Sequence, residues 1–251
     1  MTLYENPDGG YHYLEGIEPY SAGVVAMAGF EIIHVTLRNP QPYRSGFERI
    51  DEFLSDQGRP RSALCAVELR LPAPLPFDGF TDFNAGYRSL LSDWSLLLDG
   101  RNPVARTNVA PEVQPPSEPS LYAFSFTRPS QPRSLPTFIV AGAGDLNDQA
   151  ALLPSAVVRA GETSTDALRE KAACVMQVMH DRLHGLGRNW DEVTTTNVYT
   201  IQPLETFLKR AILDVAGTPA IHGLHWHYSH PPIADLIFEM DVRGVDRELF
   251  I

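Results

Sequence analysis

Four histidines crowd one short stretch of the chain, IHGLHWHYSHP, at positions His222, His225, His227 and His230. Alternate residues of a strand face the same side, so His225 and His227 could ligate one metal ion. A metal site also needs a third ligand and supporting partners, and the sequence has no HExxH or comparable motif. The pattern favours polar pocket lining or solvated strand residues, so we expect no metal site.

Other motifs that carry chemistry are missing from the sequence. It has no GxSxG elbow, phosphate-binding loop, dinucleotide fingerprint or clustered Cys/His zinc pattern. This argues against serine hydrolases, kinases and nicotinamide-dependent enzymes, and predicts no cofactor. Cys65 and Cys174 lack CxxC spacing and are interpreted as buried, reduced thiols.

Composition narrows the expected partners. The formal net charge is −11 and there is no basic run, so nucleic acid is an unsuitable partner, since its binding depends on Lys and Arg neutralising phosphates. The first residues, MTLYENPDGGYHYLEG, have no basic segment followed by an apolar stretch, and no later segment reaches membrane-spanning length. We therefore expect a cytoplasmic protein that does not contact a membrane.

The first half of the chain alternates strand-like and helix-like patterns. Ser45 and Glu48 form a predicted capping box, and the helix after them ends at Gly58. A second helix carries apolar residues at three- and four-residue spacing from Phe83 to Trp94. The predicted strands are 24–28 and 31–37, joined as a hairpin at Gly29, then 63–71, 104–109 and 121–126.

The second half repeats this order. Residues 138–144 read as a strand that runs into a glycine turn, and a helix with one apolar face spans about 164–186. A strand at 193–201, a short helix at 205–215, and strands at 222–228 and 235–242 follow. The repeat indicates an internal duplication, with domains at 1–127 and 137–251 joined by a linker at 128–136.

Several short pieces resemble the RidA/YjgF family of reactive-intermediate deaminases. They are PYSAGVV (19–25), FTDFNAGYRSLL (80–91), NPVART (102–107), FIVAGAG (138–144), LHGLGRNWDEV followed by TTTNVYT, and IFEMDV (237–242). The resemblance implies an α/β (α+β) fold of two tandem chorismate-mutase-like domains, each a mixed β-sheet backed by two helices. It also implies a homotrimer with pockets between neighbouring domains.

The resemblance further implies a reaction and its residues. Such enzymes hydrolyse a carboxylated imine or enamine to a carbonyl compound and ammonia. Arg106 would bind the substrate carboxylate through a two-bond fork, and Glu239 would manage water and protons. The backbone amides of Gly142 and Gly144 would approach the bound carboxylate, although a plain turn also explains these glycines.

The second helix of the first half also matches the resembled family. Its Asn84, Tyr87 and Arg88 would serve packing and contacts between subunits.

Aligning the halves by their final strands pairs Arg106 with Ile221 and Phe124 with Glu239. Each half then keeps one functional side chain and replaces the other with a hydrophobic residue. Divergence could have removed the reaction and left a non-catalytic or regulatory small-ligand binder on the same scaffold. Alternatively, one pocket between the domains combines Arg106 with Glu239 and deaminates a carboxylated small molecule. A chorismatase-like enzyme is a remote third hypothesis, because chorismatases also contain RidA-like halves.

Overall fold

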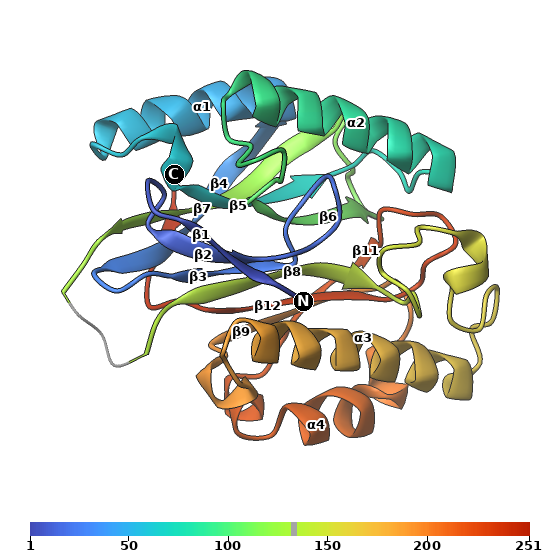
Figure 1. Ribbon diagram of the computed structural model, residues 1–251. Coiled ribbons are helices and arrows are strands. Elements are labelled where there is room, and N and C mark those ends of the chain that lie inside the picture. Colours follow the sequence, from blue (N-terminus) through green and yellow to red (C-terminus); the bar gives the residue numbers. More distant parts are fainter. Residues whose placement is uncertain (132–134) are drawn as a thin grey trace.

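The computed structural model of this chain describes residues 1–131 and 135–251. Its elements form four layers, in which two β-sheets lie face to face and helices cover both outer faces (Figure 1). Helices α1 and α2 cover one sheet, and α3 and α4 cover the other. The architecture is therefore mixed α/β, as the sequence predicts at that level.

The sheet under α1 and α2 has the strand order β11-β6-β5-β7-β4-β13. Its strands are β4 (Phe30–Pro42), β5 (Leu64–Arg70), β6 (Ala105–Pro111), β7 (Ser120–Pro129), β11 (Ser229–His230) and β13 (Glu248–Phe250), and its helices are α1 (Tyr43–Asp56) and α2 (Phe77–Asp93). A single 3₁₀ turn, η1 (Arg61–Ala63), precedes β5.

The other sheet has the order β1-β2-β3-β8-β12-β9-β10. Its strands are β1 (Leu3–Asn6), β2 (Tyr11–Leu14), β3 (Gly23–Ala26), β8 (Phe138–Gly144), β9 (Thr195–Tyr199), β10 (His225–His227) and β12 (Glu239–Gly244). Its helices are α3 (Thr165–Gly185), a π-helical segment η5 (Leu208–Leu213) and α4 (Asp214–Ala216). Short 3₁₀ turns lie at Pro154–Ala156, Trp190–Glu192, Leu204–Thr206 and Thr218–His222.

The two sheets contain the same four-strand unit. In the first, β7 pairs antiparallel with β4 and β5, and β5 pairs parallel with β6. In the second, β12 pairs antiparallel with β8 and β9, and β9 pairs parallel with β10. The element order predicted to recur along the chain is thus repeated in the strand pairing.

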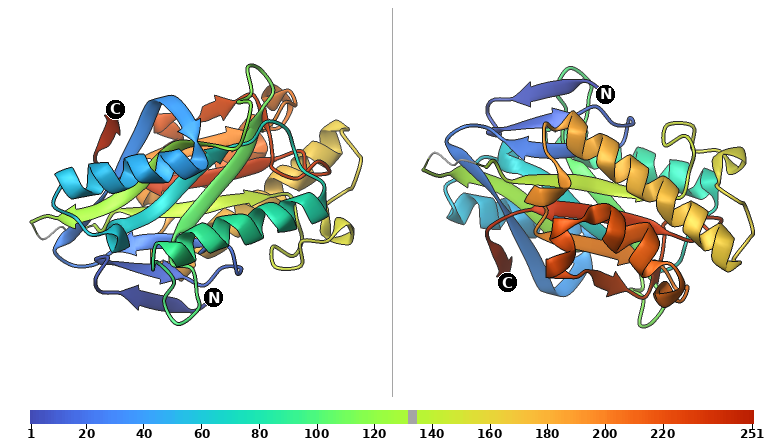
Figure 2. Two further views of the ribbon diagram at one scale, coloured as in Figure 1. Left: turned by 90° about the horizontal axis from the view of Figure 1, so that it is seen from above. Right: turned by 90° about the horizontal axis from the view of Figure 1, so that it is seen from below.

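Strands near each end of the chain pair with the sheet of the other half. The N-terminal strands β1–β3 extend the sheet of the second half through β3 and β8. In return, β13 pairs with β4 and β11 pairs with β6 in the sheet of the first half. Figure 2 shows the two chain ends at opposite edges of the molecule.

The predicted hairpin at Gly29 is wrong because its two strands belong to different sheets. Gly29 does make a turn, with a φ of 83° that favours glycine. However, the strands on its two sides separate, since β3 pairs with β2 and β8 whereas β4 pairs with β7. The turn therefore carries the chain from one sheet to the other.

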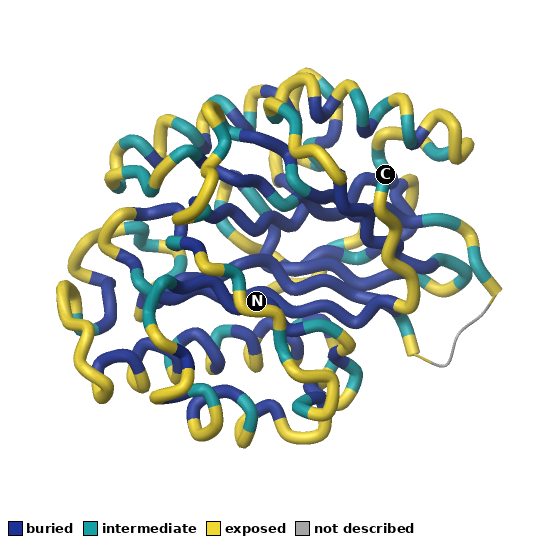
Figure 3. The backbone as a smooth tube through the Cα atoms, turned by 180° about the vertical axis from the view of Figure 1, so that it is seen from behind, coloured by how far each residue is buried: buried dark blue, intermediate teal, exposed yellow. Residues whose placement is uncertain are grey.

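Amphipathic periodicity explains how helix α1 covers its sheet. Helix α1 buries Phe47, Ile50 and Leu54, and each such side chain contributes roughly 1.5–3 kcal/mol. It begins at Tyr43 without a side-chain cap, and the Ser45 hydroxyl donates to the Pro42 carbonyl, so the predicted capping box is wrong. Figure 3 shows that both sheets are buried over most of their length.

Helix α3 follows its prediction closely. Ser164 Oγ caps it by accepting from the Ala167 amide at 3.3 Å. Its predicted apolar face is buried against β8 and β12; the face comprises Leu168, Ala172, Val175, Met179 and Leu183.

Several other predicted bounds change. Strand β8 continues through Gly144 without a glycine turn, and the predicted helix at 205–215 is mostly π-helical. The predicted strand at 222–228 shortens to β10, and β12 begins only at Glu239. Of the predicted linker at 128–136, the first two residues belong to β7, and 132–134 lie outside the described residues.

None of the helices in the described ranges combines the length and apolarity needed to cross a lipid bilayer. Cys65 and Cys174 are both free thiols, with Cys65 buried and Cys174 partly exposed.

Candidate active site

A small cavity of about 30 Å³ is lined by strands of both sheets, by α2 and by connecting loops. Strand β6 contributes Arg106 to its wall, β8 contributes Gly142 and Gly144, and β12 contributes Glu239. All four residues predicted from the sequence as binding or catalytic therefore line one cavity. They come from both halves of the chain, as the hypothesis of a combined pocket requires.

Arg106 is 2% exposed and is enclosed by aromatic rings. The centre of its guanidinium lies 4.7 Å from the ring centroids of Tyr20 and Tyr87, and 5.6 Å from those of Phe80 and Phe83. Cation–π contacts of this kind hold a guanidinium in place while leaving its donors free. Helix α2 supplies three of these rings, so it positions the arginine.

The guanidinium of Arg106 is only partly hydrogen-bonded. Its Nη2 donates to Asn84 Oδ1 at 2.5 Å, whereas the buried Nε and Nη1 have no hydrogen-bond partner among the residues that the structure describes. An unpaired buried donor on a charged group is costly, so the site is built for an anionic acceptor. Asn84 and Tyr87, which the sequence suggested only for packing and subunit contacts, thus contact the candidate carboxylate clamp.

Asn108 was missed by the sequence reasoning. It lies two residues after Arg106 in β6, on the same face, and lines the same cavity. Its side chain is buried, and within residues 1–131 and 135–251 neither Oδ1 nor Nδ2 has a hydrogen-bond partner. A buried amide with both groups unpaired calls for a ligand that both donates and accepts hydrogen bonds.

Glu239 is buried next to Gly142. A Cβ atom at position 142 would lie 2.5 Å from Glu239 Oε1, so glycine leaves the space that the carboxyl occupies. Burial holds the pKa of Glu239 well above its ordinary value, and nearby Asp241 raises it further against the lowering effects of Arg182 and Arg106. A carboxyl in this state keeps its proton at higher pH and can donate it.

A buried ion pair fixes the chain next to Glu239. Lys171 of α3 donates to Asp145 at 2.8 Å, and both side chains are 0% exposed. The other oxygen of Asp145 accepts from the amides of Ile237 and Phe238, at 3.0 and 3.1 Å. The start of β12, and hence the position of Glu239, is set by these bonds.

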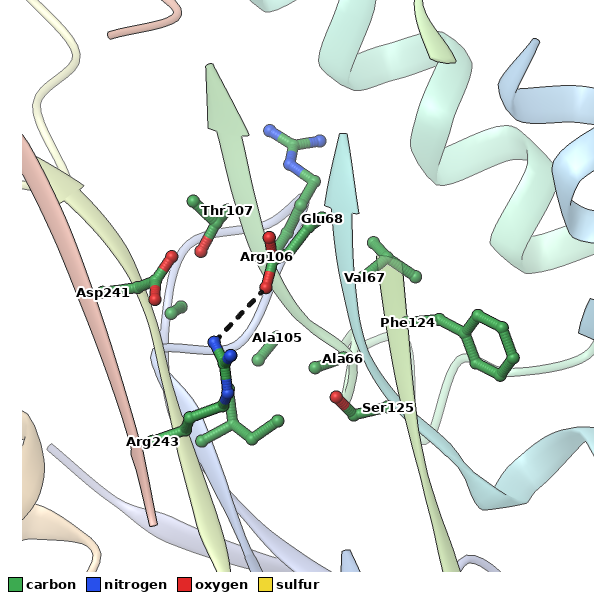
Figure 4. Close-up of a pocket in the computed structure, with 12 residues that line it drawn as sticks. Ala66, Val67, Glu68, Ala105, Arg106, Thr107, Phe124, Ser125, Asp241 and Arg243 are labelled. Atoms are coloured by element: carbon green, nitrogen blue, oxygen red, sulfur yellow. Dashed lines mark ion pairs between the residues drawn. The ribbon is translucent and has the colours of Figure 1, made fainter. Parts of the chain in front are cut away.

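A second polar cluster lies between the sheets, and its charges are paired (Figure 4). Glu68 lies 3.3 Å from Arg70 and 3.8 Å from Arg243, and Arg243 also contacts Glu248 at 2.8 Å. Asp241 accepts hydrogen bonds from Asn197 Nδ2 and Tyr199 Oη, both at 2.8 Å. We call Glu68, Arg70, Asp241, Arg243 and Asn197 the paired cluster.

The histidines of the first motif border this paired cluster or lie at the surface. His227 stacks on Tyr199, and burial followed by the charge of Arg70 lowers its pKa to about 4. His230 lies 2.7 Å from Glu112 at an exposed position. Within residues 1–131 and 135–251, no group of three His, Cys, Asp or Glu side chains could hold a metal ion.

The predicted correspondence between the halves fails at both residue pairs. Ile221 lies in the 3₁₀ turn Thr218–His222 and is 84% exposed, so it is not a strand residue like Arg106. Phe124 packs against Phe53 of α1 on the outer face of its sheet, whereas Glu239 faces the cavity. A constant offset fails because the second half replaces the long helix α2 with short helical segments.

Comparison with known proteins identifies the family. The model of the 2-aminomuconate deaminase CnbZ family matches residues 3–249. The chain belongs to this family. It is also 40% identical over 241 residues to a 2-amino-5-chloromuconate deaminase from Comamonas testosteroni, covering 96% of this chain and 95% of that protein.

The chain is also similar to a crystal structure of chorismatase. The match covers 89% of this chain and 77% of the chorismatase chain, with a TM-score of 0.46 and 12% sequence identity. A likeness this distant says nothing about the reaction.

The family match corrects the RidA/YjgF resemblance, which is wrong. The resembling pieces were short strand, glycine and helix segments, and a repeated strand–helix unit produces such segments in unrelated families. The general prediction of a deaminase agrees with the family, whereas the assignment to the RidA/YjgF family does not.

Proposed function

We propose that this protein hydrolytically deaminates 2-aminomuconate or a close derivative, an unsaturated dicarboxylate with one amino group. The single observation that carries the proposal is the cavity in which a buried Arg106 with free donors meets a buried Glu239 of raised pKa. Family membership and the chlorinated substrate named for the relative support the choice of substrate.

The free donors of Arg106 bind the carboxylate next to the amino-bearing carbon. Asn108 is available to the amino group or to the oxygen that replaces it, because it can both accept and donate hydrogen bonds. Both side chains are already buried and held in place, so little ordering is needed when the substrate binds.

Glu239 manages the protons of the reaction. Protonated Glu239 donates to a carbon of the diene, which converts the enamine into an iminium ion. Water then adds to the iminium carbon and gives up a proton to the Glu239 carboxylate, and proton transfer to nitrogen lets the carbon–nitrogen bond break. Substrate and water thus become a 2-oxo dicarboxylate and ammonia, and Glu239 returns to its starting state.

Ammonia release from 2-aminomuconate, followed together with loss of the diene absorbance, tests the proposal. The wild-type protein should release one ammonia per substrate, and Arg106→Met should lose nearly all turnover. Arg49→Met removes an exposed arginine of α1 and should behave as wild type. Thermal stabilisation by the substrate without ammonia release would instead support the hypothesis of a non-catalytic ligand-binding protein and contradict the deaminase proposal.

Two further predictions from the sequence, on domain structure and on oligomeric state, remain proposals. We propose that residues 1–127 and 137–251 are chorismate-mutase-like domains, which the repeated strand order supports. We also propose a homotrimer, and sedimentation of the purified protein tests it.

A further inference from the structure

The cavity at Glu239 adjoins a larger one. The second cavity measures about 440 Å³ and shares Tyr20 and Gln149 with the first. The small cavity alone holds little more than a water molecule or two, so most of a bound dicarboxylate must lie in the adjoining space. The larger cavity is therefore where the far end of the substrate has room.

Arg182 of α3 lines this larger cavity. Its side chain is buried, and its Nη1 donates to the carbonyl oxygens of Ala141 and Gly142 at 2.8 and 3.1 Å. These bonds fix the guanidinium against β8. Among the described residues, no hydrogen bond uses its Nε or Nη2, and no carboxylate forms an ion pair with it.

Arg106 and Arg182 both lie near Glu239. Arg106 lines the same cavity as Glu239, and Arg182 donates to the carbonyl of Gly142, the residue that adjoins the Glu239 carboxyl. Neither arginine has an ion-pair partner in the described part of the chain. The pKa of Glu239 is raised, which favours its neutral form, and a neutral carboxyl does not form an ion pair. Two uncompensated buried positive charges match a ligand with two negative charges.

We propose that Arg182 binds the second carboxylate of the substrate while Arg106 binds the first, so that Arg182 selects dicarboxylates over monocarboxylates. This inference rests on the proposed function and assigns the substrate-specificity determinant of the same site. The outer rim of the larger cavity carries Glu15, Asp148 and Asp181, which are exposed and screened by water. Their charge disfavours a carboxylate at the rim, which leaves the inner wall at Arg182 as the place for it.

Two non-reacting ligands isolate this role. trans,trans-Muconate and sorbate share the same six-carbon diene, but sorbate has a methyl group where muconate has its second carboxylate. Calorimetry should show that the wild-type protein binds muconate at least about tenfold more tightly, the scale of one charge-assisted contact. Arg182→Met should abolish this preference and leave sorbate affinity nearly unchanged, whereas Arg106→Met should weaken both ligands.

Two further variants guard against a purely structural effect. Arg182→Lys keeps the charge but loses the planar fork, so it should retain part of the preference. Arg169→Met removes an exposed arginine from the same helix and should keep the wild-type ratio. A general loss of stability would weaken both ligands alike and leave their ratio intact.

Equal affinity of the wild-type protein for the two ligands would overturn the inference, as would an unchanged muconate-to-sorbate ratio in Arg182→Met. If Arg182→Met does not fold, an unchanged ratio in Arg182→Lys overturns it instead. These ligands do not react, so failure here is separate from failure of the deaminase proposal, which shows as missing ammonia release from 2-aminomuconate.

Discussion

The cavity region and the paired cluster are two buried polar regions of the molecule that differ in how their polar groups are paired. In the paired cluster, Arg70 and Arg243 contact carboxylates, and the Asn197 amide binds Asp241. In the cavity, Arg106 and Asn108 leave donors and acceptors unpaired. Unpaired buried groups cost stability, so their presence marks the place where a ligand completes the structure.

The largest expected contrast is between two glutamates. Glu239→Gln should lower kcat by about 10²–10⁴-fold, because it removes the proton-transfer group from the cavity. Glu68→Gln, in the paired cluster, should leave kcat per folded molecule within a few-fold of wild type. Steady-state ammonia release by both variants measures kcat. An equal loss of kcat in the two variants would contradict the assignment of catalysis to the cavity alone.

The two classes of buried arginine should differ in stability. Arg243→Met removes the arginine partner of the partly exposed Glu248 and one of the two arginines beside Glu68, which keeps Arg70, and should destabilise the fold by about 1–3 kcal/mol. Arg106→Met removes a charge that has no ion-pair partner, so its free energy of unfolding should stay level or rise. Urea denaturation of both variants gives the comparison, and a large destabilisation in Arg106→Met would contradict it.

Asparagines provide a smaller, matched test. Asn197→Leu removes a hydrogen bond to the buried Asp241 carboxylate and should cost about 1–3 kcal/mol of stability. Asn108→Leu replaces an unpaired amide and should be neutral or stabilising, with a loss of turnover. The same denaturation and turnover assays apply, and the reverse order of stabilities would show that Asn108 is paired in solution.

The smallest effect concerns pH. The folded state raises the pKa of Glu239 above its ordinary 4.5, so the folded protein binds this proton more tightly than the unfolded chain does. Stability should therefore fall as pH rises from about 4.5 towards the folded pKa, by at most about 1.4 kcal/mol per pH unit.

Glu239→Gln should flatten this slope. Adding Asp241→Asn should flatten it further, because the folded state raises the pKa of Asp241 as well. Urea unfolding between pH 5 and 8 measures the slopes, and a slope unchanged in Glu239→Gln would place its pKa at the ordinary value.

Local patterns predicted much of the secondary structure and less of its pairing. The faces of α1 and α3 followed from apolar spacing, because an amphipathic helix can bury only one side. Strands β1, β2 and β13 were not predicted, since short strands at sheet edges carry little alternation. The pairings of β3 with β8 and of β13 with β4 join distant parts of the chain, and the sequence has no local signal for such contacts.

The candidate site was predicted in part for a similar reason. Arg106 and Glu239 were named through a family resemblance that proved wrong, but the hypothesis that they share a pocket agrees with the structure. Asn108 and Arg182 were missed because each sits in an ordinary amphipathic or alternating segment. Only burial without a hydrogen-bond partner distinguishes Asn108, and only coordinates reveal it.

The exchange of terminal strands also bears on how the protein forms during synthesis. The sheet of the first half gains its outer strand, β13, only when Glu248–Phe250 have left the ribosome. Strands β1–β3 must wait for β8, which lies in the second half of the chain, before they join a larger sheet. Such distant pairings slow folding, so the nascent chain cannot finish one half before it starts the other. The candidate cavity, whose wall includes Glu239 of β12, is thus among the last features to form.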